Sequence, residues 1–349
     1  MATRQQLTLL VATVAVVVAA VTAVFLPVPY VILSPGPTLN TLGTGPGGRS
    51  LIEISGHPTY PAAGHLNLVT VSFQGGPEGS FNIFAALRAW LTPHEAVVPE
   101  EELFGPGQTQ RQVVQQDTQQ MASSQQTATA AALCVLGIPF TTLDTIVTVE
   151  KGFPAAGLLH PHDVITAVDG RPVNCKQDAA PMIRARAPGA QVTLTVQRTV
   201  NGHRVTRQVS LTTVNSGGRA VVGVTVAESY VFPFNVRIRV GDIGGPSAGL
   251  MFALGIVDKL TPGNLTRGKF VAGTGEISAD GTVSPIGGIQ QKLVGARDAG
   301  ATIFLTPAAN CPDTAGAVPA GLRLVKVSTL SGAVSALRAL AAGRSVPSC

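Results

Sequence analysis

The feature that most constrains this chain is a long uncharged stretch near its amino terminus. Residues 7–26 contain no charged side chain and are rich in Val, Ala and Leu, and Arg4 precedes them. About 20 apolar residues are needed to cross a bilayer as a helix. The stretch therefore predicts a transmembrane anchor over residues 7–27, with residues 1–6 as a cytoplasmic tail.

The alternative for this stretch is a cleaved signal peptide, since the small residues at 20–23 fit a cleavage site. The apolar run is longer than the usual cleavable core, which favours a retained anchor. We therefore expect a single-pass cell-membrane protein. Its catalytic part would lie outside the cytoplasm.

Composition leaves room for real hydrophobic cores and argues against a nucleic-acid partner. The 349 residues are 45% hydrophobic, enough for two or three domains. The formal net charge is +5, yet only 12% of residues are charged. Because the basic residues never run together, the chain lacks the cationic stripe of a nucleic-acid binder.

Cysteine usage predicts neither a metal site nor a disulfide scaffold. The chain has four cysteines at irregular spacing, Cys134, Cys175, Cys311 and Cys349. They are too few and too irregular for a metal site or a disulfide scaffold. In an oxidising compartment one bridge between Cys311 and Cys349 is the hypothesis.

The segment that follows the predicted anchor reads as mixed strand and helix. Residues 51–54 and 65–73 alternate like strands, and residues 80–91 have the spacing of a short amphipathic helix. Apolar residues at helical spacing predict a long helix over residues 108–136. We assign residues 28–140 to the first part of a peptidase domain.

From about Asp144 the pattern changes to short strands separated by turns. The runs TIVTV, DVITAVDG, AQVTLTVQR and RQVSLTTV each predict strands, and PAAGLL falls on a turn. This order resembles a bacterial protease-associated PDZ domain over residues 141–215. The resemblance implies that an extended or carboxy-terminal peptide is added as a strand at an open sheet edge.

A strand, a glycine loop and a helix follow in VRIRVGDIGGPSAGLMFALGIVDKL. Proline is favoured in a first helical turn, so the helix is predicted to open at Pro246 and Ser247. Backbone N–H groups at such a terminus suit a developing oxyanion. Taken alone, the run from Gly244 fits a simple helix cap equally well.

A second helix, in GGIQQKLVGARDAGA, carries Lys292 on a stripe of small and apolar residues. The side chain of a lysine on such a stripe usually extends its amine to solvent. Here no carboxylate stands three or four positions away to pair with that amine. Burial would lower the pKa of the amine. A neutral amine beside a hydroxyl is a general base.

The region from about residue 236 to 307 resembles the proteolytic domain of Lon peptidases. The nucleophile motif Gly-Pro-Ser-Ala-Gly stands at residues 245–249, Thr-Gly-Glu-Ile at 274–277, and Gly-Gly-Ile-x-x-Lys at 287–292. The resemblance implies a catalytic dyad with supporting groups. Its members are Ser247 as nucleophile, Lys292 as base, Thr274 as support for the amine, and the N–H groups of Ser247 and Gly244 as oxyanion donors.

The chain departs from the Lon pattern in two ways. Gly244 stands where Lon proteins usually have aspartate. Residues 263–269 have the glycines and lysine of a nucleotide-binding loop, but Phe270 replaces the required Ser or Thr.

All six histidines precede residue 236, so a local Ser-His pair is impossible.

The chain is therefore predicted to be an ATP-independent serine endopeptidase with no metal and no cofactor. Its expected partners are unfolded or flexible peptides, and the resemblance implies a homo-oligomer. The alternative is a catalytically silent, membrane-tethered PDZ adaptor. A signal-peptidase-like Ser-Lys enzyme is disfavoured by motif order.

The predicted fold class is an α/β (α+β) Lon-type domain with an inserted, mainly β PDZ-like domain and one amino-terminal transmembrane helix. The strand at 65–73 and the long helix resemble the early elements of Lon proteolytic domains. Residues 216–349 would then complete the catalytic region. An insertion is tolerated when its two ends lie close together.

Overall fold

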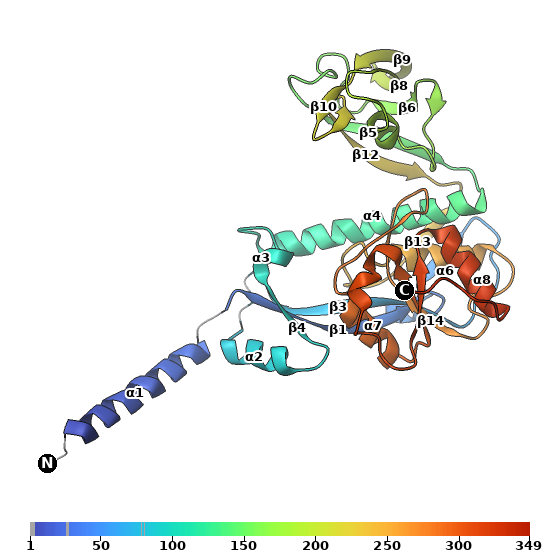
Figure 1. Ribbon diagram of the computed structural model, residues 1–349. Helices are drawn as coiled ribbons and strands as arrows, with labels where there is room; N and C mark the ends of the chain where they lie inside the picture. The colour runs from blue at the N-terminus through green and yellow to red at the C-terminus, as the bar shows by residue number, and fades with distance from the viewer. Residues whose placement is uncertain (1–3, 26–27, 78, 80) are drawn as a thin grey trace.

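The computed structural model describes residues 4–25, 28–77, 79 and 81–349. The described chain has an amino-terminal helix, a main unit made of residues 28–136 and 232–349, and a PDZ-like unit made of residues 141–231 (Figure 1). The PDZ-like unit lies beside the carboxy-terminal half of the long helix α4 (Gln110–Leu136). The amino-terminal helix extends away from both units.

The amino-terminal helix α1 (Arg4–Phe25) covers most of the predicted anchor. Its large apolar side chains are exposed, among them Leu10 and Val16. No helix in the described ranges combines the length and apolar character required to cross a membrane. Residues 26 and 27, the end of the predicted anchor, lie outside the described residues.

A six-stranded mixed sheet organises the main unit. Its strand order is β18-β17-β14-β3-β1-β4. The members are β1 (Tyr30–Asn40), β3 (His65–Gly75), β4 (Ala96–Pro99), β14 (Phe270–Gly273), β17 (Ile303–Pro307) and β18 (Arg323–Val327). The pairs β14·β3, β14·β17 and β17·β18 are parallel, whereas β1 pairs antiparallel with β3 and β4.

Short strand pairs and helices complete the main unit. The strands are β2 (Ile52–Ser55), which pairs with β13 (Asn235–Ile238), and β15 (Glu276–Ile277), which pairs with β16 (Val283–Ser284). The helices are α2 (Ile83–Leu91), α3 (Glu100–Leu103), α4 (Gln110–Leu136), α6 (Gly249–Leu260), α7 (Ile289–Asp298) and α8 (Leu330–Ala341). The predicted helices at 80–91 and 108–136 are therefore present with slightly later starts.

Helix α4 forms because its ends are well capped and one face is small and apolar. Thr109 and Gln112 make a reciprocal capping box at its start, and Gly137 ends it in the left-handed conformation. Ala128 and Ala131 are fully buried in the core, to which α6 also contributes. Their small size lets the two helices lie close together.

The PDZ-like unit is built on a second sheet, of order β12-β5-β6-β8-β9, with β7 paired to β6. The strands are β5 (Thr141–Val149), β6 (Val164–Val168), β7 (Arg171–Pro172), β8 (Gln191–Val200), β9 (His203–Thr212) and β12 (Val224–Val231). The short helix α5 (Ala179–Arg184) and the hairpin of β10 (Val214–Ser216) and β11 (Arg219–Val221) complete it. This unit has its own core, which includes Ile146, Ile165 and Val192.

Two observations bear on the predicted domain boundaries. The main sheet combines strands from before and after the PDZ-like unit, because β14 pairs directly with β3. The expected end of the PDZ-like domain at residue 215 is too early, because β12 pairs with β5 along its whole length. The sequence analysis assigned β12 to the catalytic region. The alternation of apolar and polar residues predicts a strand but does not show which strand it pairs with.

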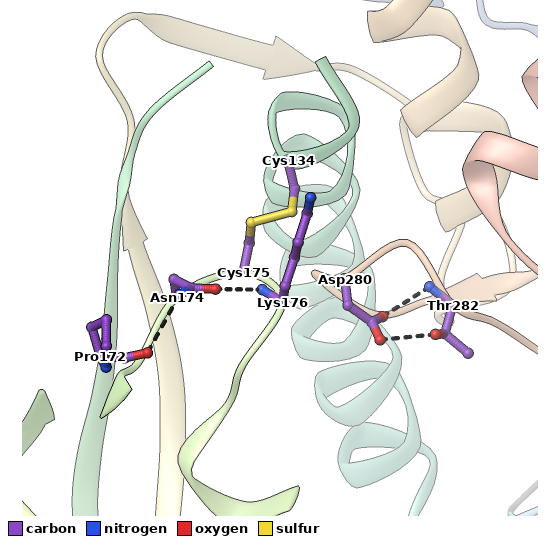
Figure 2. Close-up of a disulfide and its surroundings, with 7 residues drawn as sticks. All are labelled: Cys134, Pro172, Asn174, Cys175, Lys176, Asp280 and Thr282. Atoms are coloured by element: carbon purple, nitrogen blue, oxygen red, sulfur yellow. Dashed lines mark hydrogen bonds between the residues drawn. A yellow bond between two sulfur atoms is a disulfide. The ribbon is translucent and has the colours of Figure 1, made fainter. Parts of the chain in front are cut away.

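The four cysteines all lie among the described residues, where they form two disulfides. Cys311 pairs with Cys349, as hypothesised from the sequence. The second bridge, Cys134 to Cys175, was not predicted and joins the end of α4 to a loop of the PDZ-like unit (Figure 2). It therefore fixes the PDZ-like unit to the helix from which the chain enters it.

Candidate active site

Ser247 lies in a turn between the glycine loop and helix α6. The helix begins at Gly249, so the predicted opening at Pro246 is three residues too early. The N–H of Gly249 donates to the carbonyl of Pro246 at 3.3 Å, which closes the turn. The carbonyl of Ser247 accepts from the N–H of Gly275 at 2.8 Å and from the hydroxyl of Thr274 at 2.9 Å.

Helix α4 also holds the glycine loop before Ser247 in place, through two hydrogen bonds. The hydroxyl of Ser124 donates to the carbonyl of Pro246 at 3.0 Å, and the N–H of Gly245 donates to the carbonyl of Asp117 at 3.1 Å. Sequence reasoning assigned no role to either α4 residue. Nothing in the local pattern marks them, because their partners lie more than a hundred residues away in the chain.

Lys292 reaches the serine from helix α7. Its Nζ lies 2.8 Å from Oγ of Ser247 and 3.0 Å from Oγ1 of Thr274. The residue just before the helix is Gly288, whose φ of 66° is in the left-handed region. A Cβ there would lie 2.7 Å from Cγ2 of Val71, so the start of α7 can approach β3 only with glycine at this position.

Burial gives Lys292 its chemical character. The residue is 3% exposed, and none of the ion pairs in the described chain involves it. Burial lowers the pKa of the Lys292 amine to about 7. At neutral pH a large fraction of this amine is therefore unprotonated beside a hydroxyl.

A cleft of about 970 Å³ opens over this pair. Ser247, Lys292, Gly244 and Asp117 all lie on its wall, together with one edge of β3. None of its described lining residues is a histidine. Burial raises the pKa of the Asp117 carboxyl.

The four residues predicted for the site are thus close together, three of them in direct contact. Ser247, Lys292 and Thr274 form a connected set of hydrogen bonds, and Gly244 lines the same cleft. In the described part of the chain, the N–H groups of Ser247 and Gly244 donate to no other protein group. Both remain available to a ligand in the cleft.

Comparison with known protein families places this site in a recognised class. Residues 236–336 match the Lon protease (S16) C-terminal proteolytic domain, and residues 134–211 match the PDZ domain. The chain therefore carries a Lon-type serine protease domain together with a PDZ domain.

Three curated relatives show how far the likeness extends. The Lon protease of Roseiflexus castenholzii is 34% identical over 108 residues, covering 30% of this chain and 13% of that protein. For the Lon protease of Chloroflexus aurantiacus the identity is 34% over 137 residues, covering 38% and 16%. Lon protease 1 of Sorangium cellulosum is 42% identical over 94 residues, covering 26% and 11%. This chain thus matches only a small part of the length of these relatives.

Among solved structures, the PDZ domain of an SdrC-like protein from Listeria innocua is similar to the PDZ-like unit. It is 22% identical, with coverage of 24% of this chain and 92% of that chain, at a TM-score of 0.21. The corresponding domain from Listeria monocytogenes is 24% identical, with coverage of 24% and 85%, at the same TM-score of 0.21.

Proposed function

We propose that this chain is an ATP-independent serine endopeptidase that uses Ser247 as nucleophile and Lys292 as general base. The observation that carries the proposal is the 2.8 Å contact between a buried lysine amine and a serine hydroxyl at the wall of a large cleft. A desolvated amine is a competent base at neutral pH.

In the proposed reaction, the neutral Lys292 amine accepts the proton of the Ser247 hydroxyl while Oγ attacks the scissile carbonyl carbon. The N–H groups of Ser247 and Gly244 stabilise the oxyanion that forms. The resulting ammonium then returns its proton to the leaving amine, which leaves an acyl group on Oγ. A water molecule, deprotonated by the same amine, releases the acyl group.

Thr274 acts as a positioning residue in this scheme. Its hydroxyl donates to the carbonyl of Ser247 and accepts from the amine of Lys292, so it links the two reacting residues. The PDZ-like unit would supply peptide recognition in place of ATP-driven selection. The homo-oligomer implied by the Lon resemblance remains a prediction, which light scattering of the purified chain would check.

We also propose that residues 7–27 anchor the chain at a membrane with the catalytic part outside the cytoplasm. The exposed apolar side chains of α1 support an apolar environment for that helix. Two disulfides support an oxidising compartment, where such bonds persist. Protease protection of the chain in sealed vesicles tests this placement: with the catalytic part outside, only inverted vesicles would shield it.

The test of the proposed activity compares the full chain with Ser247→Ala and Lys292→Met, using fluorogenic casein. The structure offers a matched control, because Lys259 and Ser50 form a second lysine–serine hydrogen bond, at 3.3 Å, outside the cleft. Both site variants should lose at least about 1,000-fold in kcat. Lys259→Met and Ser50→Ala should keep cleavage close to that of the native chain.

Two results would contradict the proposal. Equal cleavage by the native chain, Ser247→Ala and Lys292→Met would exclude the dyad. No cleavage of casein or of a peptide library by the native chain would favour the silent adaptor instead.

A further inference from the structure

A second cleft, of about 330 Å³, lies in the PDZ-like unit beside α5 and β12. One wall is the face of α5 that presents Ala180, Ile183 and Arg184, and the other is the segment 220–226. β12 is the terminal strand of its sheet, so its outer edge has no strand partner in the described chain. An extended peptide can therefore pair with this edge while its side chains reach α5.

The charges around this cleft are unbalanced. Three carboxylates line it, from Asp144, Glu150 and Glu228, against the single guanidinium of Arg184. Asp144 and Glu228 are directly opposite one another in the β5·β12 pair. The negative charge is therefore concentrated where a peptide side chain would cross from β12 toward the start of α5.

One of these carboxylates is buried and only half satisfied. Asp144 is 1% exposed, and its Oδ2 accepts from the N–H of Ala179 at 2.9 Å. Its Oδ1 is buried without a hydrogen-bond partner in the described structure. An acceptor left unpaired in this way is destabilising, and a donor from a ligand would satisfy it.

Burial and the nearby Glu228 raise the pKa of the Asp144 carboxyl. Burial, Glu228, Asp144 and Asp280 raise the pKa of neighbouring Asp178 to about 7. A cation placed among these groups would favour their charged forms and be attracted in return. The site is thus complementary to an ammonium or guanidinium group.

Resting on the proposed peptide-recognition role of the PDZ-like unit, we propose that this cleft binds an extended peptide with a lysine or arginine side chain between Asp144 and Glu228. The backbone of the peptide pairs with the outer edge of β12. The cationic side chain donates to Oδ1 of Asp144 and lies against the Glu228 carboxylate. Apolar side chains on either side contact Ile183 and Val226.

The free N–H groups of the loop before β12 define where the peptide can end. Gly223 has a φ of 80°, and the N–H groups of Val222 and Gly223 donate to no protein group in the described chain. Glu228 lies on β12, five residues after Gly223, and a peptide paired with β12 advances by one residue for each residue of the strand. If the ligand is a peptide carboxyl terminus held at these N–H groups, its basic residue therefore stands four or five positions before the end.

The test uses the full chain carrying Ser247→Ala, so that bound peptides are not cleaved. Fluorescein-labelled octapeptides with valine-rich sequences carry Lys, Gln or Glu at the fifth position from the end, each with a free or an amidated terminus. Fluorescence anisotropy should show the Lys peptide binding about tenfold tighter than the Gln peptide. A loss of affinity on amidation identifies a carboxyl terminus as the ligand, and equal affinity identifies an internal segment.

Variants of the two carboxylates then locate the interaction. Glu228→Gln and Asp144→Asn should each reduce the preference for Lys over Gln to about threefold or less. Glu228→Lys should reverse it in favour of the Glu peptide. Glu101→Gln, an exposed acid on α3 outside the cleft, is the matched control and should leave the preference unchanged. Circular dichroism checks that Asp144→Asn remains folded, and Glu228 carries the test if it does not.

The proposal is wrong if the Lys and Gln peptides bind equally to the folded Ser247→Ala chain. It is also wrong if the Glu228 variants keep the Lys preference of that parent chain. Casein cleavage by the native chain is measured alongside. Retained cleavage without Lys preference overturns this inference alone, whereas loss of cleavage with Lys preference intact overturns only the catalytic proposal.

Discussion

Gly244 and Asp117 approach each other so closely that no side chain fits between them. A Cβ on Gly244 would lie 2.6 Å from Cβ of Asp117. The glycine loop before Ser247 is therefore pressed against helix α4, and the Asp117 carboxyl stands at the cleft wall beside it. Glycine at this position is explained by close approach, since its φ is not in the left-handed region.

Gly244→Ala should reduce kcat/KM by about 100-fold, because the added Cβ pushes the glycine loop away from α4 and displaces Ser247. Steady-state cleavage of casein measures this. Gly287→Ala is the matched control, since a Cβ there meets no atom within 4 Å. A second change, Asp117→Gly, removes the obstructing Cβ and should restore part of the activity. Full activity in Gly244→Ala alone would contradict the steric explanation.

The pH dependence of cleavage should report the Lys292 amine. Because the neutral amine is the base and burial lowers its pKa to about 7, kcat/KM should rise about tenfold per pH unit below pH 7 and level off above it. The measurement is the initial rate of peptide cleavage between pH 5 and 9. A midpoint near the ordinary pKa of an exposed lysine would show that the amine is not desolvated during catalysis.

Lys292→Met should make the folded chain more stable at neutral pH. The amine binds a proton more tightly in the unfolded chain than in the folded one, so protonation favours unfolding. This cost is fully present below pH 7 and declines as pH rises toward the ordinary lysine pKa. We expect a gain of about 2–4 kcal/mol at pH 7 that shrinks by pH 9. Urea unfolding at the two pH values measures it, and an unchanged difference would contradict the assignment.

Thr274→Val should lower kcat/KM by about 10- to 100-fold, because Lys292 and the carbonyl of Ser247 both lose a hydrogen-bond partner. The midpoint of the pH profile should also move to lower pH, since the ammonium form loses an acceptor. Thr274→Ser keeps the hydroxyl and should restore both values. A loss of activity with an unmoved midpoint would indicate a packing role only.

The sequence was most informative where short-range pattern and chemistry coincide. Apolar spacing within each segment was enough to predict the long helix α4, the short helix α2 and the strand β3. Ser247, Thr274 and Lys292 were selected from three motifs together, and the structure brings them within hydrogen-bond distance.

The parts that could not be predicted depend on contacts between distant segments. Asp117 and Ser124 support the glycine loop across more than a hundred residues of chain, and β12 joins a strand about 80 residues earlier. The later start of α6 follows from the turn at Pro246, which propensity alone places in the helix. None of these features has a local signal in the sequence.

The bridge between Cys134 and Cys175 makes the arrangement of the two units depend on the chemical surroundings of the chain. Its helix, α4, also supports the glycine loop through Ser124, ten residues before the cysteine. In a reducing compartment the segments at 137–140 and 232–234 would be the remaining covalent links between the units, and contacts such as those of α4 with β12 would have to hold the peptide cleft in place relative to the serine. The same polypeptide would then have its two units covalently cross-linked on the oxidising side of a membrane and not on the reducing side.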